Sequence, residues 1–294
     1  MKFGLIIVGD EILSGKRADK HLPKFIELLH ARGLQLEWAE YVGDSPDRIT
    51  ATLKRAFESG DAVFSTGGIG ATPDDHTRQC AARALGVALA LHPQAEALIR
   101  ERMQDTAREQ GTVYEPDRPD NIHRLNMGVF PVGAEIIPNP YNKIPGFSIE
   151  SPIERRAGPP QAARAPSGGS DPHEMRERGG VHFVPGFPVM AWPMMESVLE
   201  SQYRHLFQTS AWVEKSVIVF GAMEAALTPL MEDIERLHVG VKVFSLPSVD
   251  HPQYGRHIEL GVKGPPALVD VAYPALRLGL EKFTSTLGPE LVRN

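Results

Sequence analysis

The residues best suited to chemistry lie in one glycine-rich stretch, residues 65–77 (STGGIGATPDDHT). Three glycines in a short loop let the backbone turn tightly and come close to a ligand. The exposed backbone amides of such a loop, together with those of a following helix N-terminus, favour anions such as phosphate. We therefore expect the loop to bind phosphate groups through glycine amides and threonine hydroxyls, namely those of Gly67, Gly68, Gly70, Thr66 and Thr77.

Two adjacent carboxylates, Asp74 and Asp75, follow the glycines. Carboxylates repel phosphates unless a cation lies between them, so this combination indicates a phosphate site bridged by a divalent metal ion such as Mg²⁺. An ordinary helix start is the alternative, with Thr72 as the N-cap, Pro73 at the first helical position and Asp75 imitating a capping box. That alternative explains Asp75 but not the glycines.

More polar side chains follow two earlier apolar runs. Asp10, Glu11 and Ser14 come after the first run, and Asp44 follows the second. Open α/β sheets bind ligands beyond the carboxyl ends of their parallel strands, where all these residues would meet. Asp10 and Glu11 are candidates for bonding a ligand or for holding a polar turn. Asp44 is either a helix N-cap or a carboxylate of the site.

Two alternating hydrophobic periodicities predict the elements that position these residues. Apolar runs at 3–8, 34–42 and 62–65 indicate strands, and helical spacing indicates helices between them and from Thr72 onward. This order predicts an α/β fold with a parallel sheet and helices on both faces. Farther along we expect helices over 93–109 and 190–206, a polar loop over 112–124, and short strands at 135–137, 146–149 and 181–184.

The composition changes twice along the chain. Residues 154–180 are dense in Pro, Gly, Ala and Arg and have no apolar period, so we expect a disordered insertion within a first domain of residues 1–208. From 212 to 294 the pattern strand-helix-strand-strand-helix predicts a second, small α+β domain. A length of 294 residues with 42% hydrophobic residues is enough for two such domains.

Charge and cysteine content exclude several classes of protein. The chain has 31 Lys and Arg against 37 Asp and Glu, a net charge of −6, which gives no electrostatic footprint for nucleic acid. One cysteine, Cys80, excludes a disulfide framework and a thiolate zinc site. The opening apolar run ends at Val8, too short for a signal peptide or a membrane span. We therefore expect a cytoplasmic protein with no membrane partner.

Taken in order, these segments resemble the MoCF, or molybdopterin-binding, domain of the MogA, MoaB and gephyrin type. They are most similar to the version found in the N-terminal region of CinA-type (competence/damage-inducible) proteins. The resemblance rests on GDEILSG at 9–15, VGD at 42–44, TGGIGATPDDHT at 66–77, and two Pro-Gly turns beginning at Pro145 and Pro185. The second unit is similar to the small KH-like domain of those proteins. No segment resembles their C-terminal amidase domain.

The resemblance implies a three-layer MogA/MoaB-like fold and two classes of ligand. Domains of this type in molybdenum-cofactor enzymes bind or adenylylate molybdopterin, and aspartates matching Asp44 and Asp75 take part in their catalysis. CinA-type domains are associated with metal-dependent hydrolysis of ADP-ribose to AMP and ribose 5-phosphate. The resemblance also places the turn at Pro145 and Gly146 beside the ligand, and it implies a homo-oligomer.

Our first hypothesis is therefore a metal-dependent ADP-ribose pyrophosphatase. In this hypothesis Asp74 and Asp75 bind Mg²⁺, Mn²⁺ or Co²⁺, Asp44 and Asp75 act in catalysis, and Asp10 and Glu11 orient a ribose or a second metal-bound water. The alternatives are a protein that binds or adenylylates molybdopterin and a non-catalytic ligand-binding module. We do not expect nucleic acid to bind, because the second domain shows no Gly-x-x-Gly clamp on a basic surface.

Overall fold

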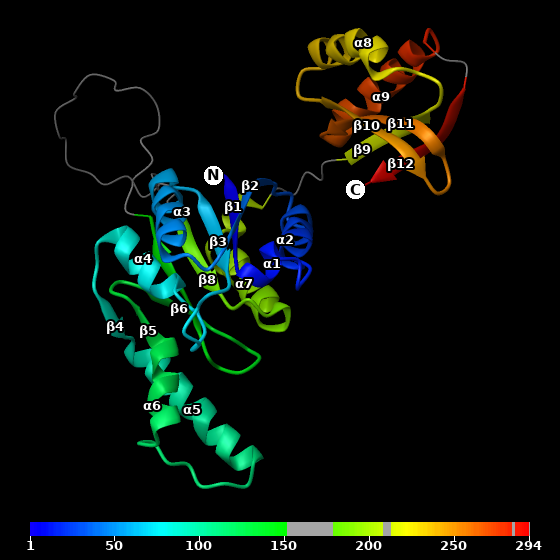
Figure 1. Cartoon of the computed structure of the whole chain (residues 1–294). Coiled ribbons are helices and arrows are strands. Elements are labelled where there is room, and N and C mark those ends of the chain that lie inside the picture. Colours follow the sequence, from blue (N-terminus) through cyan, green and yellow to red (C-terminus); the bar gives the residue numbers. More distant parts are fainter. Residues whose placement is uncertain (152–178, 208–212, 284–285, 294) are drawn as a thin grey trace, which may run out of the picture. The chain divides into compact units, whose positions relative to one another are not determined.

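A computed structural model of the chain describes residues 1–151, 179–207, 213–283 and 286–293 (Figure 1). The chain divides into two units, Met1–Phe207 and Gln208–Asn294. Most of the predicted insertion, residues 154–178, lies outside the described residues, and Gly180 at its end already belongs to a strand. Each unit has its own hydrophobic core.

A six-stranded sheet forms the centre of the first unit, in the order β2-β1-β3-β8-β7-β6. Its strands are β1 (Phe3–Val8), β2 (Leu36–Val42), β3 (Ala62–Thr66), β6 (Glu135–Ile137), β7 (Gly146–Glu150) and β8 (Gly180–Val184). The first four strands in the sheet order are parallel, and β7 runs antiparallel to both of its neighbours. The prediction of a mostly parallel sheet is confirmed.

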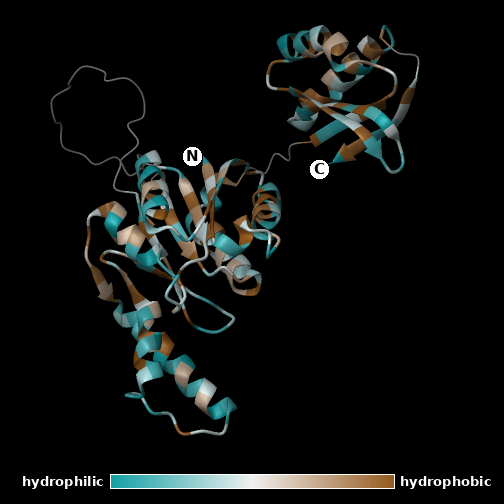
Figure 2. Ribbon diagram, in the orientation of Figure 1, coloured by the Kyte–Doolittle hydropathy of each residue, from teal (hydrophilic) through white to brown (hydrophobic). Residues whose placement is uncertain are grey.

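Helices cover both faces of this sheet, which gives the predicted three layers. Side chains alternate along β1, so Leu5 packs with α2 (His21–His30) and α7 (Pro188–Gln202), whereas Ile6 packs with α3 (Pro46–Ser59) and α4 (Thr77–Leu85). Figure 2 shows hydrophobic residues concentrated in the strands of this sheet. None of the described helices has the length and apolar composition needed to cross a membrane.

One helix boundary differs from the prediction and bears on the site. The helix after the glycine loop begins at Thr77, five residues later than expected, so Thr72 is not its N-cap and Pro73 is not its first residue. The amide of Thr77 donates to the carbonyl of Gly68, 3.0 Å away, so the first residue of the helix is hydrogen-bonded to the glycine loop. Residues 72–75 instead form a separate turn in which the Asp75 amide donates to the Thr72 carbonyl.

A helical arm extends from the first unit away from the sheet (Figure 1). It contains β4 (Leu89–Leu91), α5 (Pro93–Glu109), α6 (Pro119–Arg124), a 3₁₀ turn at Leu125–Gly128 and β5 (Val129–Pro131), with β4 and β5 paired antiparallel. The predicted polar loop over 112–124 is therefore partly wrong. A proline at the first position and the ion pair between Arg118 and Asp120 support α6, although its six residues are too few to show helical periodicity.

The second unit is a four-stranded antiparallel sheet with two helices. The sheet order is β10-β11-β9-β12, and the elements are β9 (Val213–Val219), α8 (Glu224–Leu237), β10 (Lys242–His251), β11 (Gly255–Gly264), α9 (Pro266–Leu280) and β12 (Leu287–Arg293). The sequence pattern missed β12. Its sequence LGPELVR contains glycine and proline, and the strand tolerates them because it lies at the edge of the sheet, where its register with β9 is interrupted.

Candidate functional site

A cleft of about 1050 Å³ lies beyond the carboxyl ends of the parallel strands of the first unit. Its walls come from segments that follow β1, β2, β3 and β8, together with the loop before β7. Of the predicted site residues, nine line this cleft: Glu11, Asp44, Thr66, Gly67, Gly68, Gly70, Asp74, Asp75 and Pro145. Four do not: Asp10, Ser14, Thr77 and Gly146.

The glycine loop is held in place through its carbonyl groups. The Thr77 hydroxyl donates to the Gly67 carbonyl at 3.1 Å, and the Thr77 amide donates to the Gly68 carbonyl. The guanidinium of Arg78 donates to the Ile69 carbonyl at 2.6 Å. All three of these carbonyls therefore point toward the start of α4.

The same bonds determine where the loop amides point. In a planar trans peptide the C=O of one residue and the N–H of the next point in opposite directions. The N–H groups of Gly68, Ile69 and Gly70 therefore point away from α4, on the side of the cleft. None of these three amides donates to an acceptor in the described part of the chain. Three neighbouring amides that are free on the same side of a loop are suited to an anion.

The glycines are required by backbone conformation and space. Gly67 and Gly68 have φ angles of +92° and +68°, a region that favours glycine. A Cβ atom would collide with the Val8 carbonyl at position 67 and with the Thr77 hydroxyl at position 68. The amide of Gly67 itself donates to the Val184 carbonyl at 3.1 Å. Gly67 thus joins the loop to the end of β8 and, contrary to our expectation, offers no free amide to a phosphate.

Thr77 and Gly146 also have roles other than those predicted. Thr77 is fully buried and its hydroxyl is used by the Gly67 carbonyl, so it shapes the loop and does not line the cleft. Gly146 lets β7 approach β8, because a Cβ atom there would collide with the Phe183 carbonyl. Thr66 does line the cleft, but its hydroxyl is buried and faces the Ile6 carbonyl at 3.5 Å.

Asp10 and Asp44 bind each other's backbone. The Asp10 amide donates to Asp44 Oδ2 at 3.0 Å, and the Asp44 amide donates to Asp10 Oδ1 at 3.1 Å. Gly43 makes this pairing possible, because a Cβ atom there would collide with the Asp10 carboxylate. Asp10 therefore supports the site without lining the cleft, and Asp44 is not an N-cap by side-chain bonding. Ser14 is exposed outside the cleft.

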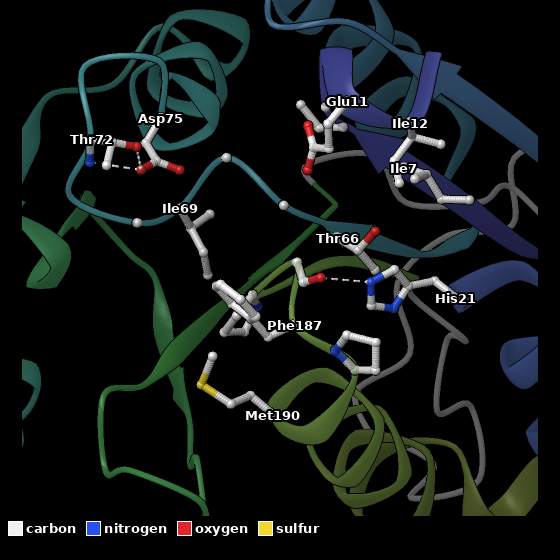
Figure 3. A pocket seen from close by; sticks show the side chains of 18 of the residues that line it. Ile7, Glu11, Ile12, His21, Thr66, Ile69, Thr72, Asp75, Phe187 and Met190 are labelled. Atoms are coloured by element: carbon white, nitrogen blue, oxygen red, sulfur yellow. Dashed lines mark hydrogen bonds between the residues drawn. The ribbon is translucent and has the colours of Figure 1, made fainter. Parts of the chain in front are cut away.

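Several negatively charged side chains surround Asp44 in the cleft. Partial burial raises the pKa of Asp44 above its usual value, although the hydrogen bond from the Asp10 amide opposes the shift. Repulsion from Asp10, Glu11 and Asp74 raises the pKa further. Glu11 points toward the glycine loop in Figure 3.

Asp75 lies at the far end of the loop, beside Thr72 (Figure 3). Its Oδ2 accepts hydrogen bonds from the Thr72 amide at 2.8 Å and the Thr72 hydroxyl at 2.6 Å. Its Oδ1 has no donor among the described residues. A Cβ atom at position 70 would lie 2.5 Å from Asp75 Oδ2, so Gly70 is needed to bring the loop against this carboxylate.

The carboxylates of the cleft fit a metal ion only if water and phosphate oxygens complete its coordination shell. Within the described residues, no group of three or more His, Cys, Asp or Glu side chains is arranged to hold a metal ion by itself. Mg²⁺ is commonly bound by one or two carboxylates and completes its shell with water and phosphate oxygens. Asp74 belongs to the crowded negative charge around Asp44 and is adjacent in the chain to Asp75, so this pair fits a cation that binds together with a phosphate ligand.

Four residues of the site were not predicted from the sequence: Arg17, His21, Arg78 and Phe187. Burial lowers the pKa of Arg78 to about 10, so the guanidinium behind the loop keeps its charge at neutral pH and favours an anion. His21 Nε2 bonds the Gly186 carbonyl at 3.0 Å, and burial lowers the pKa of its ring. Two of them lay beside features that the sequence had indicated: Arg78 directly follows the loop motif, and Phe187 lies in the Pro-Gly turn that begins at Pro185.

Residues 4–205 match the family described as "Probable molybdopterin binding domain". A CinA-like protein of Anaeromyxobacter dehalogenans (strain 2CP-C) is 33% identical over 150 residues, which cover 51% of this chain and 34% of the relative. A putative competence-damage inducible protein of Alkaliphilus metalliredigens (strain QYMF) is 26% identical over 237 residues, 80% of this chain and 48% of the relative. The matches thus span between a third and a half of these relatives.

Among solved structures, the CinA protein of Thermoplasma acidophilum, described as having unknown function, is similar with a TM-score of 0.50 and 24% identity. The match covers 68% of this chain and 98% of that one. The family match and the relatives confirm the resemblance to the CinA-type molybdopterin-binding region. The solved structure confirms the predicted α/β fold class.

Proposed function

The chain belongs to the family of probable molybdopterin binding domains, and we propose that its cleft binds a small molecule that carries a diphosphate group. The observation that supports this most strongly is the set of free N–H groups at Gly68, Ile69 and Gly70 on the side of the cleft. The buried charge of Arg78 lies directly behind them. The cleft is as large as the pockets that hold drug-sized ligands.

The reaction we propose is hydrolysis of the diphosphate of ADP-ribose. Water adds to one phosphorus atom, the bridging P–O bond breaks, and the products are AMP and ribose 5-phosphate. The loop amides would stabilise the negative charge that develops on the phosphate oxygens. Asp44 is suited to accept the proton of the attacking water, because its raised pKa makes it a stronger base than an ordinary aspartate.

A divalent ion would be held by Asp74 and by Asp75 Oδ1, together with phosphate oxygens. When bound, it supplies charge neutralisation and lowers the pKa of coordinated water. The Thr72 bonds to Asp75 Oδ2 keep the other oxygen of that carboxylate oriented. This assignment follows the donor set, which is made of hard oxygen ligands.

A second candidate ligand is molybdopterin, which the family description favours. Its phosphate would use the same amides, and its adenylylation would also create a diphosphate linkage. The third hypothesis is a module that binds such a ligand without catalysing a reaction.

One experiment separates these readings. Purified protein is incubated with ADP-ribose and Mg²⁺, Mn²⁺ or Co²⁺ in turn, and the products are separated by chromatography, with Asp75→Asn as the matched variant. We expect metal-dependent AMP and ribose 5-phosphate from the wild type only, while thermal denaturation shows Asp75→Asn to be folded. Wild-type turnover by Asp75→Asn would refute the metal assignment. Absence of product with every metal would favour a protein that binds molybdopterin or a module without catalytic activity. A titration with molybdopterin would then distinguish these two hypotheses.

A further inference from the structure

Phe187 is a large apolar side chain that lines the cleft and remains 54% exposed. It lies three residues after the end of β8 and directly before α7, and the preceding Gly186 packs against Gly67 of the glycine loop. Figure 3 shows it in the cleft together with Ile69 and Met190. An exposed aromatic ring inside a ligand cleft costs free energy that a bound apolar surface would recover.

The backbone around Phe187 is fixed on both sides. Before it, Gly186 packs against Gly67, where a Cβ atom would lie 3.4 Å from the Gly67 Cα, and the Gly186 carbonyl accepts a hydrogen bond from His21. After it, the amides of Met190 and Ala191 donate to the Phe187 carbonyl at 3.0 and 2.9 Å. The ring is therefore presented at a defined distance from the loop amides by a rigid segment.

Arg17 lies over this ring. The guanidinium carbon is 5.9 Å from the ring centroid, an arrangement typical of a cation–π contact. Arg17 is exposed and forms no ion pair with a residue of the described segments. Its planar guanidinium can stack on a second ring as well as on Phe187.

We propose that Phe187 and Arg17 form an aromatic subsite, which binds the flat nitrogen heterocycle of the ligand while the diphosphate lies on the amides of residues 68–70. The inference rests on the proposed function and concerns the part of the ligand that the glycine loop does not contact. The shared chemistry is a planar heterocycle, either an adenine or a pterin. The volume of about 1050 Å³ leaves room for such a ring beyond the phosphates.

The test is a calorimetric titration of the full chain and of Phe187→Ala and Phe187→Tyr. The probes are ADP-ribose, inorganic pyrophosphate, adenosine and 6-hydroxymethylpterin. Loss of one stacking partner corresponds to roughly tenfold weaker binding or more. We therefore expect Phe187→Ala to weaken ADP-ribose binding by about tenfold and to leave pyrophosphate binding unchanged. Phe187→Tyr should restore ADP-ribose binding, because it keeps the ring.

Every other outcome overturns the aromatic subsite, the proposed function or both. Equal binding of ADP-ribose to the wild type and Phe187→Ala overturns the subsite, and so does an equal loss of pyrophosphate binding, which would show a purely structural role. If neither diphosphate binds but adenosine or the pterin binds and depends on Phe187, the subsite stands and the proposed function is refuted. If no probe binds the wild type, both are overturned. The heterocycle that binds more tightly identifies the ligand class.

Discussion

Asp44 is a carboxylate of the cleft whose ionised form is disfavoured in the folded protein. Its carboxylate is partly buried and is surrounded by Asp10, Glu11 and Asp74, which together place its pKa above the ordinary value of 3.8. Ionising it therefore costs more in the folded protein than in the unfolded chain. Proteins accept such a cost where the charge has a function.

We predict that Asp44→Asn raises the melting temperature at neutral pH. Well below pH 3.8 Asp44 is protonated in both the folded and the unfolded state, so it does not lower the free energy of unfolding. As the pH rises, Asp44 ionises first in the unfolded chain, and the free energy of unfolding falls. The fall ends when the carboxyl has also ionised in the folded protein. Asparagine keeps an oxygen for the Asp10 amide and carries no charge. The difference between variant and wild type should therefore be present at pH 7 and absent at acidic pH in thermal denaturation. A variant less stable at pH 7 would contradict this account.

At the scale of elements, the central feature is the attachment of the glycine loop to the start of α4. Thr77 supplies two of the bonds that orient the loop peptides, one from its hydroxyl and one from its amide. The hydroxyl bond is fully buried, so its loss leaves the Gly67 carbonyl without a partner. The loop then loses the constraint that points the Gly68 amide toward the cleft.

We predict that Thr77→Ala destabilises the fold by about 1–3 kcal/mol, the cost of one buried unsatisfied carbonyl. It should also weaken binding of pyrophosphate, although Thr77 does not line the cleft. Thr77→Ser keeps the hydroxyl and is the matched control. Denaturant unfolding and calorimetric titration measure the two effects. If Thr77→Ala lost affinity with no loss of stability, the residue would be a ligand contact, as the sequence first indicated.

The sequence predicted most of the strands, and with them the position of the cleft, because these strands follow from local signals. The continuous apolar run of Phe3–Val8, a helical period ending at Gly60 and glycines after Thr66 each reflect residues close together in the chain. The predicted start of α4 was wrong because Thr72–Asp75 forms a turn with the same hydrogen-bonding residues as a capping box. Phe187 and His21 were missed because only the fold brings residues so far apart in the chain to the glycine loop.

For the molecule as a whole, the described residues that line the cleft all come from the first unit. Every residue that lines it lies between Ile7 and Met190. The core of the second unit, built around Val217, Leu260 and Leu276, shares no residue with the cores of the first. The free energy of ligand binding should therefore come from the first unit.

We predict that a fragment of residues 1–207 folds and binds the same ligand with an affinity within about threefold of the full chain, a difference below 1 kcal/mol. The measurements are circular dichroism for folding and calorimetry for binding. A folded fragment that binds far more weakly would show that the second unit contributes to the site.

An NMR titration of the full, isotope-labelled chain with pyrophosphate and then with ADP-ribose tests directly whether the glycine loop binds a diphosphate. If the loop binds the diphosphate, the amide protons of Gly68, Ile69 and Gly70 should move downfield together and saturate at one dissociation constant, and the Gly67 amide, which is bound to Val184, should move little. Shifts confined to other segments, or no shift at saturating ligand, would contradict the proposed site.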